Sequence, residues 1–525
     1  MKSAAGIIFR SIILLSIGFG LGLFIAFNNF NRRGNHDKIT QVLGLVKSNY
    51  VDSVNEDSIE GVTVNNLLQN LDPHSLYLLP QKAQSINESL EGSFEGIGLE
   101  YQLLRDTLVI TQVYTGGPAA SAGLITGDKV ISINQKKFSG TKLTAERVDS
   151  ALKRDTDATL SLSVLTANKP GIKEINIKRG HVSLSSLDAA YMAAPNVGYI
   201  KISKFALTTD ADFKAALTKL KTEGLKKLIL DIRGNGGGYL TAATSMADEF
   251  LKKGKLIVYT KGAHEERRDY FATDSGMFKE GKLAVLIDEY SASASEILAG
   301  ALQDLDRAVI VGRRSFGKGL VQQQFPFGDG SAVNLTVARY YTPSGRSIQK
   351  SYKDGVVSYH SELANRMRKG EFFSAESNLN DSIFKNRSPY HTTAGRKVFS
   401  GGGIMPDIFV PADSGQNTML LQELNDQEIF TAYTIDYLQP LINKYNTAVD
   451  FEKQYNVNDD DFEKFILYAS KSIKEMDSQE LMTSKPVIKI MLKAYAARFK
   501  WGDNAYYEVM NSDDNTLKKA IAAIN

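Results

Sequence analysis

The sequence predicts a multidomain α/β protein of 525 residues. Between Gly198 and Gly312, apolar runs alternate with helical patterns, which is typical of a largely parallel sheet covered on both faces. Residues 92–180 instead show short alternating strands between glycine-rich turns. After Asp413 the chain becomes charged and aromatic with helical spacing. A chain of this length also exceeds what one hydrophobic core normally holds.

The N-terminal sequence predicts an export signal. The apolar run SIILLSIGFGLGLFIAF, residues 11–27, has Lys2 and Arg10 before it and Arg32 after it. It is long enough to span a bilayer, and no small-x-small cleavage site ends it. We therefore expect residues 1–30 to be an uncleaved signal anchor rather than a removed signal peptide or a buried core helix. Basic residues on both sides leave its orientation open.

The rest of the chain divides by pattern. Residues 36–91 have helical spacing in two stretches, ITQVLGLVKSNYV and VTVNNLLQNL. The second stretch ends at LDPHS, which predicts a helix stop and a turn. Residues 92–180 form the β-rich module. The α/β domain spans residues 181–413, with a polar, weakly periodic insertion at about 351–397 that we interpret as a surface segment. Residues 414–525 are predicted to be a separate helical region.

Within the α/β domain five strands are predicted, with helices over residues 209–223, 240–252 and 293–305. The strands are GYIKISKF, KKLILDI, KLIVYT, KLAVLID and RAVIVG. Such runs are expected in a sheet that is covered on both faces.

Composition excludes several functions. With 43% hydrophobic and 23% charged residues most of the chain should fold, and a net charge of +3 does not indicate a nucleic-acid-binding face. The absence of cysteine removes disulfides, thiolate catalysis and cysteine-ligated zinc. No metal-ligand spacing is visible, so we expect neither a metal nor another cofactor.

The stretch GRRSFGKG, residues 312–319, suggests a phosphate-binding P-loop. That motif needs a hydroxyl residue after its lysine to hold magnesium, and a helix that begins there. This chain has Gly319, and the following LVQQQFPFGDG predicts a strand and a turn. Nucleotide binding is therefore disfavoured, and Lys318 needs another explanation.

The richest stretch is LIDEYSASASEILAGALQD, in which a strand, a turn with three serines and a helix follow one another. Ser293 and Glu296 have the spacing of a capping box. On this interpretation Ser293 only caps the helix and has no role in catalysis. A strand-to-helix turn is also where hydrolases present a nucleophilic serine, because the amides of the helix N-terminus stabilise an oxyanion.

A second turn, DIRGNGGG, residues 231–238, also follows a buried strand and precedes a helix. Parallel strands bring such ends to one edge of the sheet, where ligands bind. Glycines leave amides unshielded, as an oxyanion hole requires. A simple helix-start turn would need one glycine but not four.

A nucleophilic serine needs a general base. The chain has six histidines, none of which lies in a comparable strand-end turn. Lysine can serve when burial lowers its pKa from about 10.4 toward neutrality. The turn SFGKG follows the strand after the serine helix, so Lys318 is expected at the same sheet edge as Ser293.

These residues resemble those of the tail-specific, or carboxyl-terminal processing, serine peptidases, which use a Ser/Lys dyad. The resemblance covers roughly residues 40–410 and rests on motifs in the family's order. They are LDPHS, FEGIGL with GGPAASAGLITGDKVISIN, LILDIRGNGGG, SASASEILAGALQD, GKGLVQ, and YYTPSGRSIQ with GGGIMPDI.

The resemblance implies a crotonase-like α/β peptidase core with Ser293 as the nucleophile, Lys318 as the general base and Gln322 orienting the lysine. The oxyanion hole would be formed by the amide of Ala294 and by one glycine amide. That glycine is Gly237 or Gly238. Asp304 matches an acidic position that is functionally important in some members of the family. A purely structural role for Asp304 is equally compatible with the sequence.

The module at 92–180 resembles a PDZ domain. Such domains add a peptide as a strand and hold its C-terminal carboxylate with loop amides. The matching loop here is Gly96, Ile97, Gly98 and Leu99, although GIG also suits a simple strand-start turn. In the family this domain gates the active site as well as recognising the tail.

Together with this resemblance, the sequence predicts a serine endopeptidase that cleaves exported proteins with apolar C-termini, anchored in a bacterial inner membrane with its catalytic region in the periplasm or another extracytoplasmic space. No nucleic-acid or nucleotide partner is expected, and homo-oligomerisation or an adaptor protein remains open. The rival interpretation is a non-catalytic PDZ adaptor or chaperone on a peptidase-like scaffold. Two features depart from simpler members, namely the insertion and the helical region after Asp413.

Overall fold

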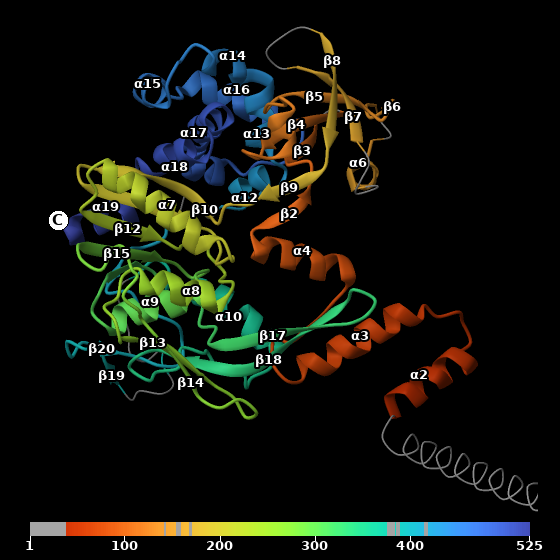
Figure 1. Cartoon of the computed structure of the whole chain (residues 1–525). Helices are drawn as coiled ribbons and strands as arrows, with labels where there is room; N and C mark the ends of the chain where they lie inside the picture. Colours follow the sequence, from red (N-terminus) through yellow and green to blue (C-terminus); the bar gives the residue numbers. More distant parts are fainter. Residues whose placement is uncertain are drawn as a thin grey trace, which may run out of the picture.

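The computed structural model (Figure 1) describes residues 38–104, 106–140, 143–153, 159–166, 171–374, 384, 389–413 and 418–525. The predicted signal anchor, residues 1–30, lies outside this part of the chain. None of the helices in the described ranges is long and apolar enough to cross a bilayer.

The N-terminal region is mostly helical, as predicted. Its elements are α2 (Lys38–Asn49), α3 (Glu56–Gln69), β1 (Leu76–Leu78) and α4 (Pro80–Glu91). The turn before β1 is held by Asp72, whose carboxylate accepts hydrogen bonds from the backbone amides of His74 (2.8 Å) and Ser75 (3.0 Å). β1 then pairs antiparallel with a strand of the α/β domain, so the LDPHS turn is fixed to that domain.

The β-rich module forms one antiparallel sheet around its own core. Its elements are β3 (Leu99–Leu104), β4 (Thr107–Val113), α5 (Pro118–Ser121), β5 (Lys129–Ile133), β6 (Lys136–Lys137), α6 (Ala145–Lys153), β7 (Thr159–Leu165) and β8 (Ile172–Lys178). In β7 the buried residues Leu160, Leu162 and Val164 alternate with less buried ones, as expected for a strand with one face on a core. A two-stranded ribbon of β2 (Ser93–Gly96) and β9 (Gly180–Ser183) joins the module to the rest of the chain.

The α/β domain contains a six-stranded sheet in the order β10-β11-β12-β15-β16-β21. The strands are β10 (Leu187–Ala194), β11 (Val197–Ile202), β12 (Lys227–Asp231), β15 (Lys282–Ile287), β16 (Val309–Gly312) and β21 (Ile408–Phe409). All neighbours from β11 to β21 are parallel, and β10 is antiparallel to β11. The carboxyl ends of β12, β15 and β16 therefore lie at one edge, as the sequence predicts.

A second, antiparallel sheet lies beside the first. It joins β1 to β13 (Leu256–Lys261), β14 (Arg268–Phe271), β17 (Leu320–Pro326) and β18 (Ala332–Tyr341). The predicted strand KLIVYT is β13, so it forms a strand but does not belong to the parallel sheet. Periodicity alone identifies a strand and not its partner.

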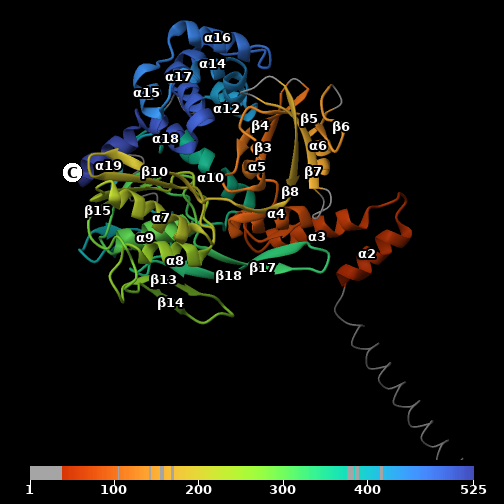
Figure 2. The same ribbon diagram turned by 45° about the horizontal axis from the view of Figure 1, so that its top comes forward.

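Helices cover both faces of the parallel sheet. On one face α7 (Thr209–Thr222), α8 (Leu240–Asp248) and α9 (Ala294–Asp304) enclose the largest core cluster. On the other face Leu517, Ala520 and Ile524 pack against the sheet residues Tyr199 and Leu286. Figures 1 and 2 show the helix that carries them, α19 (Asn515–Ile524), against the sheet.

The end of the chain therefore corrects one expectation, because residues 414–525 are not wholly separate from the α/β domain. Residues 418–501 form a helical cluster with its own core, which Ala505 and Val509 of the next helix also join. Its elements are α12 (Met419–Asp426), α13 (Ile429–Tyr433), η3 (Thr434–Leu438), α14 (Gln439–Ile442), α15 (Ala448–Gln454), α16 (Asp459–Ala469) and α17 (Ser478–Trp501). The following α18 (Asp503–Asn511) and α19 pack against the parallel sheet and cover its second face. Amphipathic spacing marks an apolar face but does not say which core that face joins.

The insertion is the second correction. Its helix α10 (Val356–Arg368) buries Tyr359, which is 2% exposed, and Arg366, which is 3% exposed. Arg366 donates hydrogen bonds to the carbonyls of Ser315 (3.0 Å) and Arg314 (2.6 Å). This part of the insertion is thus packed on the lysine turn rather than exposed. The short strands β19 (Tyr390–His391) and β20 (Lys397–Val398) follow, and the stretch ESNLNDS lies outside the described residues.

Candidate active site

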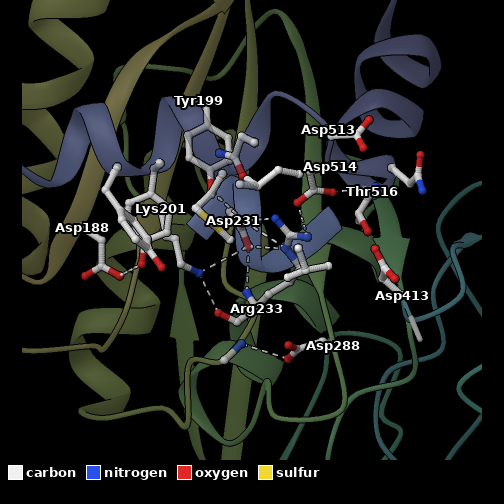
Figure 3. A pocket seen from close by; sticks show the side chains of 18 of the residues that line it. Asp188, Tyr199, Lys201, Asp231, Arg233, Asp288, Asp413, Asp513, Asp514 and Thr516 are labelled. Carbon is white, nitrogen blue, oxygen red and sulfur yellow. Dashed lines mark hydrogen bonds and ion pairs between the residues drawn. The ribbon is translucent and has the colours of Figure 1, made fainter. Parts of the chain in front are cut away.

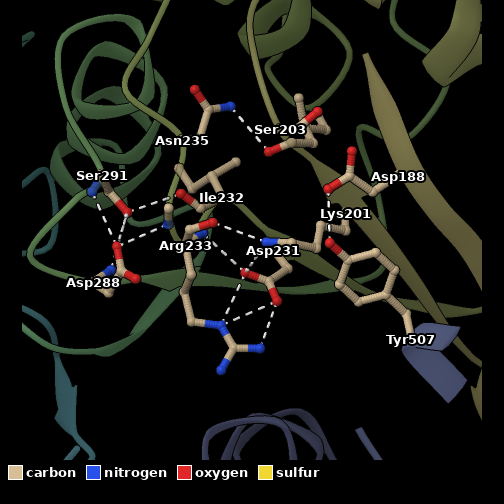
Figure 4. Close-up of polar contacts among 12 residues, drawn as sticks. Asp188, Lys201, Ser203, Asp231, Ile232, Arg233, Asn235, Asp288, Ser291 and Tyr507 are labelled. Carbon is tan, nitrogen blue, oxygen red and sulfur yellow. Dashed lines mark hydrogen bonds and ion pairs between the residues drawn. The ribbon is translucent and has the colours of Figure 1, made fainter. Parts of the chain in front are cut away.

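The serine turn presents one of its three serines to a cavity. Ser293, between β15 and α9, has φ +56° and ψ −113°, a backbone conformation that is strained for a residue with a side chain. Ser291 donates a hydrogen bond to the carbonyl of Ile232 (2.8 Å; Figure 4), and Ser295 donates one to the carbonyl of Asn235 (2.8 Å). Ser291 and Ser295 are fully buried, and Ser293 lines the cavity.

The glycine loop after β12 lies directly against this turn. Gly237 has φ +109° and Gly238 has φ +144°, which side chains rarely allow. A Cβ atom at Gly237 would lie 2.8 Å from the Cβ of Ser293, and one at Gly238 would lie 2.2 Å from the carbonyl oxygen of Phe205. Glycine is required at both positions because the loop must closely approach the serine and Phe205, which follows β11.

The geometry distinguishes the two glycines as oxyanion donors. The amide of Gly237 already donates a hydrogen bond to Asn235 Oδ1 at 2.8 Å. Gly238 and Ala294 line the cavity, and within the described ranges their amides have no recorded hydrogen-bond acceptor. Gly238 is therefore the better candidate of the two, paired with Ala294.

Lys318 lies on the turn between β16 and β17. Its Nζ donates a hydrogen bond to Gln322 Oε1 at 2.9 Å, and Gln322 Nε2 donates to the carbonyl of His74 at 2.5 Å. The LDPHS turn thus anchors the glutamine that holds the lysine. A strand, β17, begins two residues after Lys318, so the helix that a P-loop requires is not formed here.

Burial lowers the pKa of Lys318 below its ordinary value, although Asp72 and Glu296 oppose the shift. Burial, followed by the charge of Lys318, also lowers the pKa of His74 to about 3. His74 is therefore neutral near pH 7 and hydrogen-bonded through Nε2 to the hydroxyl of Tyr359 (2.7 Å). With its pKa lowered this far, the imidazole is a weak base.

Ser293, Lys318 and Gln322 line one cavity of about 300 Å³ together with Gly238 and Ala294. The remaining walls come from α4, α8, α9, β17 and β18. They consist of Ile86, Asn87, Leu90, Tyr239, Leu240, Ile297, Leu320, Val321, Gln324, Asn334 and Tyr340. Among the described residues, Lys318 Nζ donates its hydrogen bond to Gln322 and none directly to the Ser293 hydroxyl.

Glu296 is a site residue that the sequence marked only as half of a capping box. Its fully buried carboxylate accepts hydrogen bonds from the amides of Ser293 (2.9 Å), Gly317 (2.7 Å) and Lys318 (2.8 Å), and from the Ser315 hydroxyl (2.5 Å). Burial raises the pKa of Glu296 to about 7, against the effect of these hydrogen bonds. One side chain therefore holds the serine turn and the lysine turn together.

Tyr340 on β18 is a second residue that the sequence did not single out. Its buried hydroxyl lies 3.0 Å from the carbonyl oxygen of Ser293 and 2.6 Å from that of Lys318. It spans the same two turns from the other side. Its position in the motif YYTPSGRSIQ offered no signal of this contact.

Asp304 lies at the far end of α9 and does not line the cavity. Its carboxylate pairs with Arg346 at 2.8 Å, and both side chains are almost completely buried. It also accepts a hydrogen bond from the amide of Ser344 at 3.1 Å. This geometry favours a structural role, fixing the SGRSIQ turn to the serine helix.

The loop predicted to bind a C-terminal carboxylate connects β2 to β3. Gly98 has φ +79°, and Ile97 is buried. The carbonyls of Ile97 and Gly98 accept hydrogen bonds from the amides of Ala119 (2.7 Å) and Tyr114 (3.0 Å), so both are turned into the module. Leu99 lines a separate cavity of about 800 Å³ between the module and α17, where Arg498 donates a hydrogen bond to Gln112 (3.3 Å).

Three regions of the chain match known protein families. A model of peptidase family S41 matches residues 196–358, a PDZ-domain model matches residues 109–165, and a family of unknown function matches residues 420–502. The last match ends at residue 502, between the end of α17 at Trp501 and the start of α18 at Asp503.

Two relatives illustrate the likeness. A probable CtpA-like serine protease of Staphylococcus aureus is 35% identical over 335 residues, which cover 63% of this chain and 66% of that protein. A carboxy-terminal-processing protease of Bartonella bacilliformis is 38% identical over 310 residues, which cover 58% of this chain and 70% of that protein.

Among solved structures, the photosystem II D1 C-terminal processing protease is 30% identical, with coverage of 58% and 82% and a TM-score of 0.32. The match to the Bartonella protein covers more than two thirds of its length, and the S41 model covers every proposed catalytic residue. The chain belongs to peptidase family S41, as the order of its motifs predicts.

Proposed function

We propose that this protein is a serine endopeptidase that hydrolyses peptide bonds with a Ser293–Lys318 dyad. The observation that carries the proposal is the shared cavity, which brings the strained serine, a buried lysine of lowered pKa and two free amides together. A binding module has no use for this combination, so the adaptor interpretation is disfavoured.

In the proposed reaction, neutral Lys318 takes the proton of the Ser293 hydroxyl as its oxygen attacks the peptide carbonyl. The amides of Gly238 and Ala294 then donate hydrogen bonds to the oxyanion. The lysine returns the proton to the leaving amine, and a water molecule hydrolyses the acyl-enzyme with the lysine again as base. Gln322 holds the amine in place through its anchored side chain.

The substrates we propose are exported proteins with apolar C-termini, recognised by the PDZ module and its loop at residues 96–99. The family match and the PDZ match support this. The proposed location is a bacterial inner membrane, with the catalytic region in the periplasm or another extracytoplasmic space, on the basis of the apolar N-terminal run.

The test is hydrolysis of a denatured protein with an apolar tail by the purified full-length protein. We expect Ser293→Ala to abolish turnover with an unchanged circular dichroism spectrum. Ser470→Ala, at an exposed position on the C-terminal cluster, is the matched control and should retain wild-type rates. Undiminished turnover in Ser293→Ala would refute the proposed nucleophile.

A further inference from the structure

A second cavity lies on the face of the parallel sheet that α18 and α19 cover, away from Ser293. Charged residues of the α/β domain and of the segment that contains these two helices line it (Figure 3). It has a volume of about 510 Å³. Asp231 and Arg233, which begin the glycine loop, meet Asp514 here. Asp514 comes directly before α19. The proposed reaction uses none of these three side chains.

Asp231 is a completely buried anion that depends on its cationic neighbours. It accepts hydrogen bonds from Arg233 Nη2 (2.6 Å) and the Tyr199 hydroxyl (2.7 Å), and Lys201 Nζ lies 3.8 Å away. Burial alone would raise the pKa of Asp231, but the charges of Arg233 and Lys201 outweigh it and hold that pKa well below its usual range. The guanidinium of Arg233 is thereby tied to the end of β12.

Asp514 completes the charge balance from the C-terminal segment. Its Oδ2 pairs with Arg233 Nη1 at 2.7 Å, while its Oδ1 accepts hydrogen bonds from the amides of Thr516 (2.7 Å) and Leu517 (2.9 Å). The two carboxylates therefore balance the charges of Arg233 and Lys201. The same aspartate caps α19 and holds the arginine, so the helix and the loop share one fixed point.

Further hydrogen bonds hold the glycine loop after Arg233, several of which Figure 4 shows. Lys201 donates a hydrogen bond to the Arg233 carbonyl (2.8 Å), and Gly234 donates one to Asp288 (2.9 Å). Asn235 then fixes Gly237 through its side chain. Three glycines of this loop have φ between +71° and +144°, so external contacts must determine its conformation.

Other polar contacts of α18 and α19 with the sheet lie elsewhere. Tyr507 donates a hydrogen bond to Asp188 (2.9 Å) and Asn511 donates one to Tyr191 (2.7 Å), both on β10. Lys227, at the start of β12, donates one to Asn525 (2.8 Å). Among the contacts described here for these two helices, the Arg233–Asp514 pair is the one that involves a residue of the glycine loop.

We propose that Asp514 is a positioning residue for catalysis, which acts through Arg233 to keep the Gly238 amide aimed at the oxyanion. This inference rests on the proposed Ser/Lys function. It makes the C-terminal segment part of the catalytic apparatus, although it lies on the face of the sheet away from the serine. Weakening the pair lowers turnover and leaves ground-state substrate binding intact, because the oxyanion forms only in the transition state.

Asp514→Asn is the informative variant. Asparagine caps helices as well as aspartate does, so α19 keeps its start while the charge that holds Arg233 is lost. Substituting Arg233 instead would leave Asp231 as a buried charge without its main partner and threaten folding. Asp513→Asn is the matched control, since its carboxylate pairs with Lys518 and does not contact Arg233.

In the full-length protein we expect Asp514→Asn to lower kcat about tenfold, less than removal of an oxyanion donor would, with KM unchanged. The affinity for a peptide boronic acid, which places an oxygen in the oxyanion hole, should fall by a similar factor. Tm should shift by no more than ~2 °C, and Asp514→Glu should recover part of kcat. Asp513→Asn should behave as wild type.

Unchanged kcat, or a loss of kcat with unchanged boronate affinity, would overturn the inference. Ser293→Ala in the same assay separates the two levels of the argument. If that variant retains turnover, the proposed function itself fails. If it is inactive while Asp514→Asn matches wild type, only the positioning role of Asp514 fails.

Discussion

The carboxylate of Glu296 accepts a hydrogen bond from the backbone amide of Lys318 at 2.8 Å. It accepts another from the amide of Ser293 at 2.9 Å, so the two proposed catalytic turns share one buried anion. The turns come from different strand ends. Their relative position therefore depends on contacts between the turns, of which this side chain and the Tyr340 hydroxyl supply several, and not on the local conformation of either turn.

Glu296→Gln should lower both stability and turnover. The amide keeps the volume but replaces one acceptor oxygen with a donor that faces other donors, at a cost of about 1–3 kcal/mol. Urea unfolding and kcat measure the two effects. Glu280→Gln, which alters an exposed pair with Lys252, is the control. Wild-type stability together with wild-type kcat in Glu296→Gln would contradict the role of this carboxylate.

The same residue predicts a change in how stability depends on pH. Because the folded-state pKa of Glu296 is about 7, the folded protein binds its proton more tightly than the unfolded chain does. Its contribution to stability is fully present below the ordinary pKa near 4.5 and is lost as pH rises to about 7. Glu296→Gln should lack this component in unfolding curves recorded across that range.

The rate of hydrolysis should rise with pH, because Lys318 acts as a base only when neutral. Its lowered pKa places the midpoint of kcat/KM below 10.5. Below pH 7 protonation of Glu296 adds a second loss, so the acid limb should be steeper than one proton requires. A pH–rate profile tests both statements, and a midpoint at 10.5 or above would show that the buried lysine is not the base.

The folded-state pKa of Lys318 also has a consequence for stability. The folded protein binds fewer protons at this site than the unfolded chain, so the burial penalty is relieved as pH rises from the lowered pKa toward 10.5. Lys318→Met should remove this increase in the free energy of unfolding. A pH-dependence equal to that of the wild-type protein would argue against the lowered pKa.

Asp304→Asn should destabilise the protein and leave the chemistry intact. Removing one charge from a buried pair leaves Arg346 uncompensated, which typically destabilises by about 3–5 kcal/mol. We expect a lowered Tm and a near-wild-type kcat per folded molecule. Asp306→Asn, in a more exposed pair with Arg396, should have a smaller effect on Tm. A large loss of kcat with unchanged Tm would instead give Asp304 a catalytic role.

Amidation of a substrate's C-terminus should slow cleavage if the loop at residues 96–99 holds a carboxylate. Charge-assisted hydrogen bonds contribute about 1.5–3 kcal/mol each, and solvent access reduces that figure. Initial rates below saturation, with acid and amide forms of one peptide, give the comparison. Equal rates would leave this loop without its proposed role and direct attention to the cavity beside Leu99 and α17.

Much of this architecture was predictable because it is local. The strand runs, the glycine turns and the serine turn at the helix start are short-range patterns, and parallel pairing brings strand ends to one edge. Ser293 and Lys318 could therefore be placed at one edge of the sheet, and the family resemblance added Gln322, Ala294 and either Gly237 or Gly238. The S-x-x-E spacing also marked Glu296, as a cap.

Other features depend on contacts between distant segments. The strand KLIVYT joins the second sheet because β18 offers it an edge, and α10 of the insertion is buried because its arginine meets the lysine turn. Periodicity identifies an apolar face but carries no information about its partner.

The sequence by itself determined the elements, the order of the motifs and the residue types available for peptide hydrolysis, because each follows from spacing along the chain. Only the tertiary structure decided that Gly238 rather than Gly237 has a free amide, that Asp304 is committed to Arg346, and that Asp514 reaches Arg233. The last contact joins residues 281 positions apart in the sequence. Such a contact exists because hydrophobic burial of α19 on the sheet brings the two charges together, and no local pattern specifies it.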